Sequence, residues 1–286
     1  MNTQIKITEC PRDAMQGIKS YIPTTDKVRY INSLLKVGFD TLDFGSFVSP
    51  KAIPQMADTK DVLAQLDMGS SKTKLLAIIA NYRGAEEAAA YEQITYLGFP
   101  FSISETFQKR NTNSTIAESM GRVEEIQNLC VKANKQMVVY ISMAFGNSYN
   151  DPWNADIAIE WTEKIAERGV KIFAMADTVG VSNPENISYL FKNIIPKFPQ
   201  LQIGAHLHTT PTTWREKMEA ALNAGVTNFD AALKGYGGCP MAADDLTGNM
   251  PTENIVALFD EMKISHHLNK NYFLDSMQIA ETIFPH

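Results

Sequence analysis

Long hydrophobic runs are absent from the sequence, and so is the apolar segment of a signal peptide. No apolar stretch approaches the roughly 18 to 20 residues needed to span a bilayer, and residues 1–9 are mainly polar. Cysteine is scarce as well: Cys10, Cys130 and Cys239 are too few and too scattered for a disulfide framework, which is typical of a reducing compartment. We therefore expect a cytoplasmic protein with no membrane partner.

An excess of positive charge is also lacking. The 26 basic residues are outnumbered by 32 acidic ones, which gives a net charge of −6. This balance offers no electrostatic reason to expect nucleic acid as a partner. An anionic small-molecule substrate would need a local positive site, such as a metal ion or suitably placed arginine and lysine side chains.

The chain alternates short apolar segments, typical of buried strands, with amphipathic segments typical of helices. Eight such pairs predict a parallel sheet, and eight strands are the number that closes a (β/α)8 TIM barrel. A doubly wound open sheet is the alternative, but no glycine-rich phosphate loop follows the first predicted strand. The predicted strands are 4–8, 41–47, 74–80, 94–102, 136–144, 171–177, 202–208 and 227–233, and the predicted helices are 24–37, 60–66, 85–93, 114–134, 154–168, 184–198, 213–224 and 252–262.

No low-complexity segment or linker rich in proline, glycine or serine divides the 286 residues. We expect residues 1–286 to form a single catalytic domain. Residues 266–286 carry Tyr272, Phe273, Met277, Ile279 and Ile283, and this apolar content predicts an additional C-terminal helix packed on the barrel.

Polar and reactive side chains gather where the predicted strands end, which is the end of a barrel that carries the active site. The first strand leads into Arg12 and Asp13, and the sixth ends at Asp177. The seventh ends in the His-x-His pair His206 and His208. Other polar residues of this kind are Asp43 and Ser46 on the second strand, Ser104 and Glu105 after the fourth, Ser142 on the fifth, and Thr178 beside Asp177.

The His-x-His pair is the sharpest local signal. Residues i and i+2 of a strand project to the same face, so His206 and His208 can form half of a metal site. Two hydrogen-bonded core histidines are the other interpretation, and Asp13 alone could be a helix cap. Taken together, two nitrogen ligands and one carboxylate favour a catalytic Mg²⁺ or Mn²⁺ with open positions over a closed structural zinc site.

A glycine-rich segment, 235–240, is the second signal. Its glycines permit close approach to a ligand, and Cys239 within it is either a proton donor or an incidental thiol in a turn. The guanidinium of Arg12 suits a carboxylate or a developing enolate, or it pairs with Asp43 or Asp177 across the barrel mouth. Asp177 itself could cap a helix, orient a ligand or relay a proton.

These residues, in this order, resemble the 3-hydroxy-3-methylglutaryl-CoA lyase family over nearly the whole chain. The SFVSPK segment at 46–51 and the GGCP segment at 237–240 are specific, whereas His-x-His is shared by the wider metallolyase superfamily. The remaining matching residues are Pro11-Arg12-Asp13 with Gln16 and Lys19, Pro54-Gln55-Met56, Ser104-Glu105 with Asn111, Tyr140-Ile141-Ser142, the segment 177–181, and Gly248-Asn249 before Thr252-Glu253.

The resemblance implies a metal-dependent enzyme that cleaves 3-hydroxy-3-methylglutaryl-CoA (HMG-CoA) to acetyl-CoA and acetoacetate by a retro-Claisen reaction. It implies no organic cofactor beyond the coenzyme A (CoA) of the substrate, and we expect a homodimer or higher homo-oligomer. The implied metal ligands are Asp13, His206, His208 and Asn249; Arg12, Cys239, Asp177 and Asp43 would be catalytic or supporting, Gln16, Ser46, Ser142 and Thr178 would contact substrate, and Lys19 and Asn111 would lie toward the CoA moiety.

Several positions depart from the family pattern. Asp43 stands where a glutamate is usual, and Thr209 follows the histidine pair where an aspartate is usual. Cys10 and Ala14 replace glycines, and the segment 240–249 is one residue longer. These differences bear on the acyl substrate more than on the reaction class. The alternatives are a related metal-dependent aldolase or Claisen condensing enzyme acting on another acyl-CoA or 2-keto acid, and a non-enzymatic scaffold; the short segment after the barrel favours the lyase.

Overall fold

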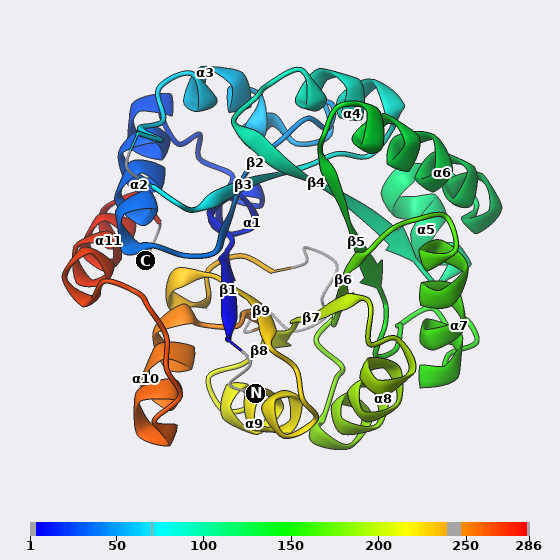
Figure 1. Ribbon diagram of the computed structural model, residues 1–286. Coiled ribbons are helices and arrows are strands. Elements are labelled where there is room, and N and C mark those ends of the chain that lie inside the picture. The colour runs from blue at the N-terminus through cyan, green and yellow to red at the C-terminus, as the bar shows by residue number, and fades with distance from the viewer. Residues whose placement is uncertain (1–3, 70, 239–246, 285–286) are drawn as a thin grey trace.

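The computed structural model describes residues 4–69, 71–238 and 247–284, and within them eight parallel strands close into a barrel (Figure 1). Each strand pairs with the next along the chain, and the last, β9, returns to pair with β1. This confirms the TIM barrel and excludes the open sheet. The strands are β1 (Lys6–Glu9), β2 (Thr41–Ser46), β3 (Lys74–Ile78), β4 (Ile94–Ser102), β5 (Gln136–Ser142), β6 (Ile172–Ala176), β7 (Gln202–His206) and β9 (Asn228–Ala231).

Helices surround the barrel in the order that the hydrophobic pattern predicts (Figure 1). Two predicted helices have the observed bounds, α2 (Thr24–Val37) and α10 (Thr252–Met262). The others correspond, with shifted ends, to α3 (Thr59–Leu63), α4 (Tyr82–Ala89), α6 (Ile116–Lys132), α7 (Ala155–Ala166), α8 (Pro184–Lys197) and α9 (Trp214–Asn223). Two further helices, α1 (Pro11–Gln16) and α5 (Glu105–Thr112), were not predicted. Both are short, so neither offers enough residues for an apolar period to be recognised.

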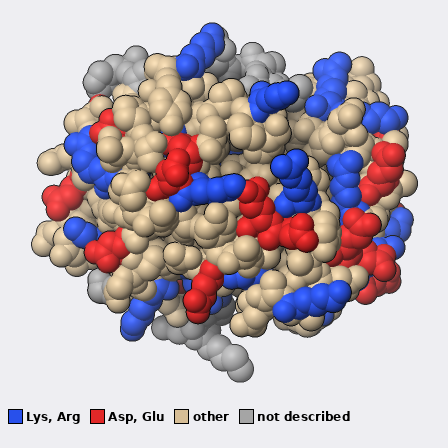
Figure 2. All heavy atoms as spheres, turned by 90° about the horizontal axis from the view of Figure 1, so that it is seen from above, with Lys and Arg blue, Asp and Glu red and all other residues tan. Residues whose placement is uncertain are grey.

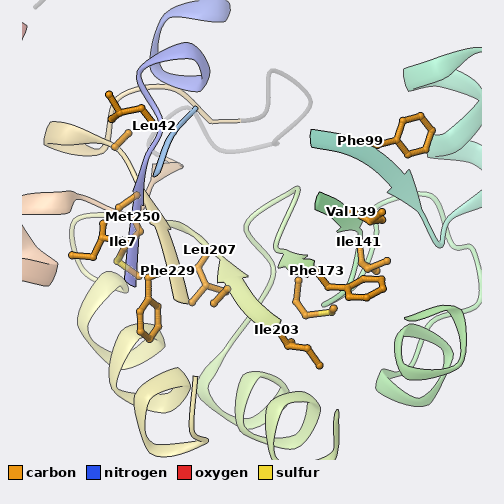
Figure 3. Close-up of a cluster of buried hydrophobic side chains, with 14 of the residues drawn as sticks. Ile7, Leu42, Phe99, Val139, Ile141, Phe173, Ile203, Leu207, Phe229 and Met250 are labelled. Atoms are coloured by element: carbon orange, nitrogen blue, oxygen red, sulfur yellow. The ribbon is translucent and has the colours of Figure 1, made fainter. Parts of the chain in front are cut away.

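The main hydrophobic core lies between the barrel and its helices (Figure 3). Successive strand residues point to opposite faces, so residues such as Val139 and Ile141 of β5 contribute to this outer layer. The intervening residues Val138 and Tyr140 belong to a second, smaller cluster with Leu76, Ile78 and Ala174. The second cluster fills only part of the barrel interior, which leaves room for polar side chains at both ends.

The C-terminal segment forms the predicted additional helix, α11 (Lys270–Ile283), which lies against α2 (Figure 1). Phe273 packs edge-on against Phe39 with ring centroids 6.4 Å apart, and Phe284 packs in the same way on Tyr30 at 5.6 Å. Within the described residues, no helix combines the length and apolar character that crossing a membrane requires. Figure 2 shows basic and acidic side chains interspersed on one face of the molecule.

A two-stranded antiparallel ladder sits at the C-terminal mouth of the barrel. It joins β8 (His208–Thr209) to β10 (Gly248–Asn249), and the register places Asn249 directly opposite His208. Two 3₁₀ turns, η1 (Pro54–Met56) and η2 (Leu233–Gly235), complete the regular structure. The ladder therefore brings Asn249, which is distant in the sequence, next to His208.

Candidate metal centre and active site

Asp13, His206 and His208 converge at the C-terminal mouth of the barrel. Each offers one ligand atom, and the three atoms lie within 4.8 Å of one another. Asp13 reaches this point from α1, which begins directly after β1 with a proline in its first turn, while the histidines lie on either side of the junction between β7 and β8. The fold thus brings the carboxylate of Asp13 and the imidazoles of His206 and His208 together, as the sequence predicted.

The hydrogen bonds of the two imidazoles leave one nitrogen of each free for a metal ion. Nδ1 of His206 lies 3.2 Å from a carboxylate oxygen of Asp230, and Nδ1 of His208 lies 3.1 Å from the carbonyl oxygen of Thr178. Nδ1–H donation to these acceptors leaves Nε2 as the basic nitrogen, which is the usual arrangement of metal-binding histidines. Nε2 of His208 is buried and has no hydrogen-bond partner, so the residues present fit a cation.

The charge state of the histidines also suits metal binding. Burial and the neighbouring His206 lower the pKa of His208 to about 4, so this imidazole is neutral at physiological pH. Burial opposes protonation of His206 too, but the hydrogen bond and negative charge of Asp230 outweigh it and raise the pKa of His206. A bound cation would displace any proton on Nε2 because a metal ligand must be deprotonated.

Asp13 is held as an oriented carboxylate. Its Oδ1 accepts hydrogen bonds from Gln16 Nε2 at 2.6 Å and from Arg12 Nη1 at 2.9 Å. Burial alone would raise the pKa of Asp13, but the positive charge of Arg12, together with the nearby histidines and the hydrogen bond from Asn249, outweighs that effect and lowers the pKa. The side chain is therefore ionised and fixed, as a metal ligand must be.

Asn249 extends this cluster from the opposite side. Its Nδ2 donates to Oδ2 of Asp13 at 2.8 Å and to the carbonyl oxygen of Tyr236, also at 2.8 Å. The predicted fourth ligand is therefore in direct contact with a second predicted ligand. Because amide oxygen and nitrogen positions are exchanged by rotation of the side chain, a cation beside Asp13 would favour the orientation that presents Oδ1.

A second set of possible ligand atoms lies deeper in the barrel, formed by Cys10, His206 and Asp230. Burial, followed by the negative charges of Asp230 and Asp43, raises the pKa of Cys10 well above its usual range. A thiol that resists ionisation is a poor metal ligand. Asp230 already accepts from His206, so the set with Asp13 and His208 is the better metal centre.

Arg12 pairs with Asp43, one of the two partners that the sequence allowed. Nε lies 3.0 Å and Nη2 2.5 Å from Oδ2 of Asp43, while Nη1 donates to Asp13 and to Gln16. A guanidinium has five N–H groups. Those contacts engage four of them within the described residues, which leaves one N–H of Nη2 available.

Arg12, Asp13 and both histidines line one cavity of about 430 Å³ at this end of the barrel. Its opposite wall is largely apolar and includes Val48, Ile53, Ile78, Pro100 and Phe107. Among the other predicted site residues, Gln16, Asn111, Ser142 and Thr178 also line it. A concave apolar site with a few convergent polar groups is the usual form of a small-molecule site.

The sequence matches the HMGL-like protein-family model over residues 4–282. The chain belongs to the HMGL-like family. It is 32% identical to the hydroxymethylglutaryl-CoA lyase YngG of Bacillus subtilis over 274 residues, which cover 95% of this chain and 90% of that protein.

Solved structures of HMGL-like relatives share the fold. The crystal structure of the Bacillus subtilis HMG-CoA lyase superposes with a TM-score of 0.91 at 31% identity, covering 98% of this chain and 94% of that chain. An HMG-CoA lyase from Acinetobacter baumannii, whose structure holds coenzyme A and 3-methylmalate, gives a TM-score of 0.89 at 27% identity, covering 98% and 91% of the two chains.

Five predicted residues in the described part of the chain do not line the cavity: Asn249, Lys19, Asp43, Asp177 and Ser46. Asp43 lies behind Arg12, and burial raises the pKa of Asp43 to about 6 although Arg12 opposes the shift. Asp177 accepts hydrogen bonds from the backbone N–H of Ser182 at 3.0 Å and from its hydroxyl group at 2.5 Å. Ser46 lines a separate surface cavity, where its hydroxyl oxygen accepts from the N–H of Val48.

Lys19 and Cys239 are the last two predicted residues. Lys19 is exposed in the bend that follows α1. Cys239 falls outside the described residues, although Gly238 beside it lines the cavity. A role of Cys239 at the cavity therefore stays a prediction.

Two residues that contact the proposed histidine ligands, Asp230 and Lys217, were not predicted from the sequence. Asp230 orients His206. Side-chain alternation along the last strand could have indicated that Asp230 points into the barrel, because the polar residues Asn228 and Asp230 are two positions apart and share one face. Lys217 of α9 donates to Asp177 at 3.0 Å and to the carbonyl oxygen of His208 at 2.8 Å. A lysine on an amphipathic helix is usually exposed, so no local signal indicated its burial.

Proposed function

We propose that this protein is a divalent-metal-dependent carbon–carbon lyase that cleaves HMG-CoA to acetyl-CoA and acetoacetate. The observation that carries the proposal is one cavity in which the free Nε2 of His208 lies with His206 and Asp13 beside the guanidinium of Arg12. The HMG-CoA lyases among the HMGL-like relatives support the same reaction.

The substrate's tertiary hydroxyl group and carboxylate would bind next to Asp13, His206 and His208. A Mg²⁺ or Mn²⁺ ion at these ligands would supply Lewis acidity that lowers the pKa of a bound hydroxyl group. Asp13 and Asn249 would fix the position of this cation, while Asp230 and the carbonyl oxygen of Thr178 hold the imidazole rings in place.

The next step breaks the carbon–carbon bond and leaves negative charge on the thioester. A base would take the hydroxyl proton. The C=O bond of acetoacetate then forms as the bond between C2 and C3 breaks, and the electron pair of that bond moves to the thioester as an enolate. We assign the free N–H of Arg12 to that developing enolate oxygen, because a fixed donor stabilises charge that appears only in the transition state. A proton from Cys239 would complete acetyl-CoA.

The remaining residues would hold the rest of the substrate. Gln16, Ser142 and Thr178 line the acyl site, and Asn111 lies on its rim in α5. We place Lys19 toward the phosphates of CoA. Ser46 and Asp43 would act through their neighbours, and Asp177 through Lys217, since none of the three lines the cavity.

We further propose that the reaction serves leucine degradation and ketone-body formation, and that the protein is cytoplasmic. All of the assigned residues come from one barrel, so we propose that residues 1–286 act as one catalytic domain. We also propose a homodimer or higher homo-oligomer, which light scattering of the purified protein would test.

The direct test is a product assay on chelator-treated protein. We expect HMG-CoA to yield acetoacetate only after Mg²⁺ or Mn²⁺ is restored, and Arg12→Lys to lower kcat by about 100-fold or more. Cleavage of another acyl-CoA in a panel, with HMG-CoA left intact, would overturn the substrate. Cys239→Ala should lose cleavage while it retains Mn²⁺ binding, and undiminished cleavage in that variant contradicts the role of the thiol.

A further inference from the structure

The barrel has a second cavity, at the end opposite the metal centre. Its volume is about 650 Å³, and it is lined by the N-terminal ends of the strands and the segments that lead into them. Inside the barrel it extends to Tyr140 and Asp230. Pockets of this size accommodate small organic ligands, and the residues assigned to HMG-CoA cleavage act from the opposite cavity.

Four lysines line this cavity: Lys6, Lys36, Lys72 and Lys74. All four are exposed, and none of them takes part in an ion pair within the described part of the chain. Lys74 instead lies over the ring of Tyr96, with Nζ 5.6 Å from the ring centroid. Two carboxylates, Asp40 and Asp230, line the same cavity, so an anion is attracted to the part of the wall where the lysines are grouped and not to the cavity as a whole.

The rim that carries three of these lysines is held in place by hydrogen bonds. The hydroxyl group of Ser71 donates to the carbonyl oxygen of Leu35 at 2.9 Å, and that of Thr73 donates to the carbonyl oxygen of Phe39 at 2.7 Å. The N–H of Lys74 donates to the carbonyl oxygen of Asp40 at 3.1 Å. These bonds fix residues 35–40 against residues 71–74, and thus set Lys36 beside Lys72 and Lys74.

A buried polar atom in the wall points to a hydroxyl-bearing ligand. Oδ1 of Asn228 is buried and has no hydrogen-bond partner, and Asn228 lines the cavity. Protein atoms cover this oxygen, so a ligand donor reaches it only after the Asn228 side chain rotates, and the bond made then would recover the free energy that the unpaired acceptor costs. Gln202 and Thr8 add further polar groups to the same wall.

We propose that this N-terminal cavity binds a small organic phosphate, with its phosphoryl group among Lys36, Lys72 and Lys74 and a hydroxyl group donating to Asn228. Lysine ammonium groups are effective point charges for phosphate. The aromatic ring of Tyr96 and the apolar side chains of Leu76 and Val138 line the space between these polar groups. A phosphorylated sugar has both of the required groups.

The test measures ligand binding by calorimetry, with ribose 5-phosphate and inorganic pyrophosphate as probes and without HMG-CoA. The double variant Lys36→Gln/Lys72→Gln removes two lysines that have no ion-pair partner, so the fold should be retained. The matched control, Lys132→Gln/Lys192→Gln, makes the same change of charge at exposed positions on α6 and α8.

We expect wild type and the control to bind ribose 5-phosphate equally, and the cavity variant to bind at least 10-fold more weakly. Asn228→Ala should weaken binding of ribose 5-phosphate but not of pyrophosphate. No binding of ribose 5-phosphate by wild type, or equal binding by the cavity variant and the control, overturns the proposal. HMG-CoA cleavage is measured separately on the same proteins, so failure of this site and failure of the catalytic assignment are distinguishable.

Discussion

Lys217 and Asp177 form a buried ion pair behind the metal centre. Nζ of Lys217 lies 3.0 Å from Oδ2 of Asp177, and the two side chains are only 4% and 0% exposed. The same ammonium group donates to the carbonyl oxygens of Gly180 and His208. One lysine therefore joins the turn after β6 to the strand that carries a proposed metal ligand.

Lys217→Met should destabilise the protein strongly. The substitution leaves the carboxylate of Asp177 buried without its cation, and breaking a buried pair in this way costs about 3–5 kcal/mol. Urea unfolding measures the loss. Lys197→Met is the control, because the pair of Lys197 with Glu163 is 44% exposed on both sides and should contribute less than about 1 kcal/mol. Equal effects of the two substitutions would contradict the prediction.

Asp230→Asn should weaken metal binding without removing a ligand. The carboxylate of Asp230 lies 3.2 Å from Nδ1 of His206 and fixes the tautomer that presents Nε2. Loss of such a partner typically lowers metal affinity about 10- to 100-fold. Mn²⁺ titration calorimetry measures the change, with Asp156→Asn on the exposed surface of α7 as the control. An unchanged affinity would show that Asp230 does not orient the ligand.

Glu9→Gln should remove a pH dependence of stability. Burial raises the pKa of Glu9 from 4.5 to about 8, although the hydroxyl group of Thr252 and the N–H of Leu233 both donate to its carboxylate and oppose the shift. The folded state therefore holds a proton that the unfolded chain releases at lower pH. The resulting stability is fully present below pH 4.5 and is lost as the pH rises through about 8.

Between those limits, this single group lowers the free energy of unfolding by up to about 1.4 kcal/mol for each pH unit. Urea unfolding from pH 5 to pH 9 should show this slope in wild type and a flatter profile in Glu9→Gln. Glu86→Gln, at an exposed position of α4, is the control and should retain the wild-type slope. Identical slopes in wild type and Glu9→Gln would refute the assignment to Glu9.

Gly237→Ala should disturb the metal centre. Gly237 has φ +84°, and a Cβ there would lie 2.5 Å from the carbonyl oxygen of Asp13 and 2.9 Å from Nδ2 of Asn249. We expect a destabilisation of more than about 1 kcal/mol and weaker Mn²⁺ binding, because both proposed ligands must shift. Gly121→Ala in α6 meets no atom within 4 Å and should stabilise the protein by about 0.5–1 kcal/mol. Wild-type Mn²⁺ affinity in Gly237→Ala would contradict the expected disturbance.

The barrel, and the residues proposed to hold a metal ion, follow largely from local patterns in the sequence. Most strands are rich in buried apolar residues, and these strands alternate along the chain with amphipathic helices, so the order of elements can be recognised from hydrophobicity. His206 and His208 are two residues apart on one strand segment, so their shared direction is a local property. The position of Asp13 directly after the first strand is likewise local.

Contacts between distant segments depend on the closed barrel. Arg12 pairs with Asp43, whereas Asp177 pairs with Lys217, and no local pattern records such pairings across the barrel. Asn249 faces His208 only through the ladder of β8 and β10. The lysine-lined cavity likewise exists because barrel closure brings the lead-in segments of separate strands together. Such contacts depend on the relative placement of elements, which hydrophobic periodicity does not encode.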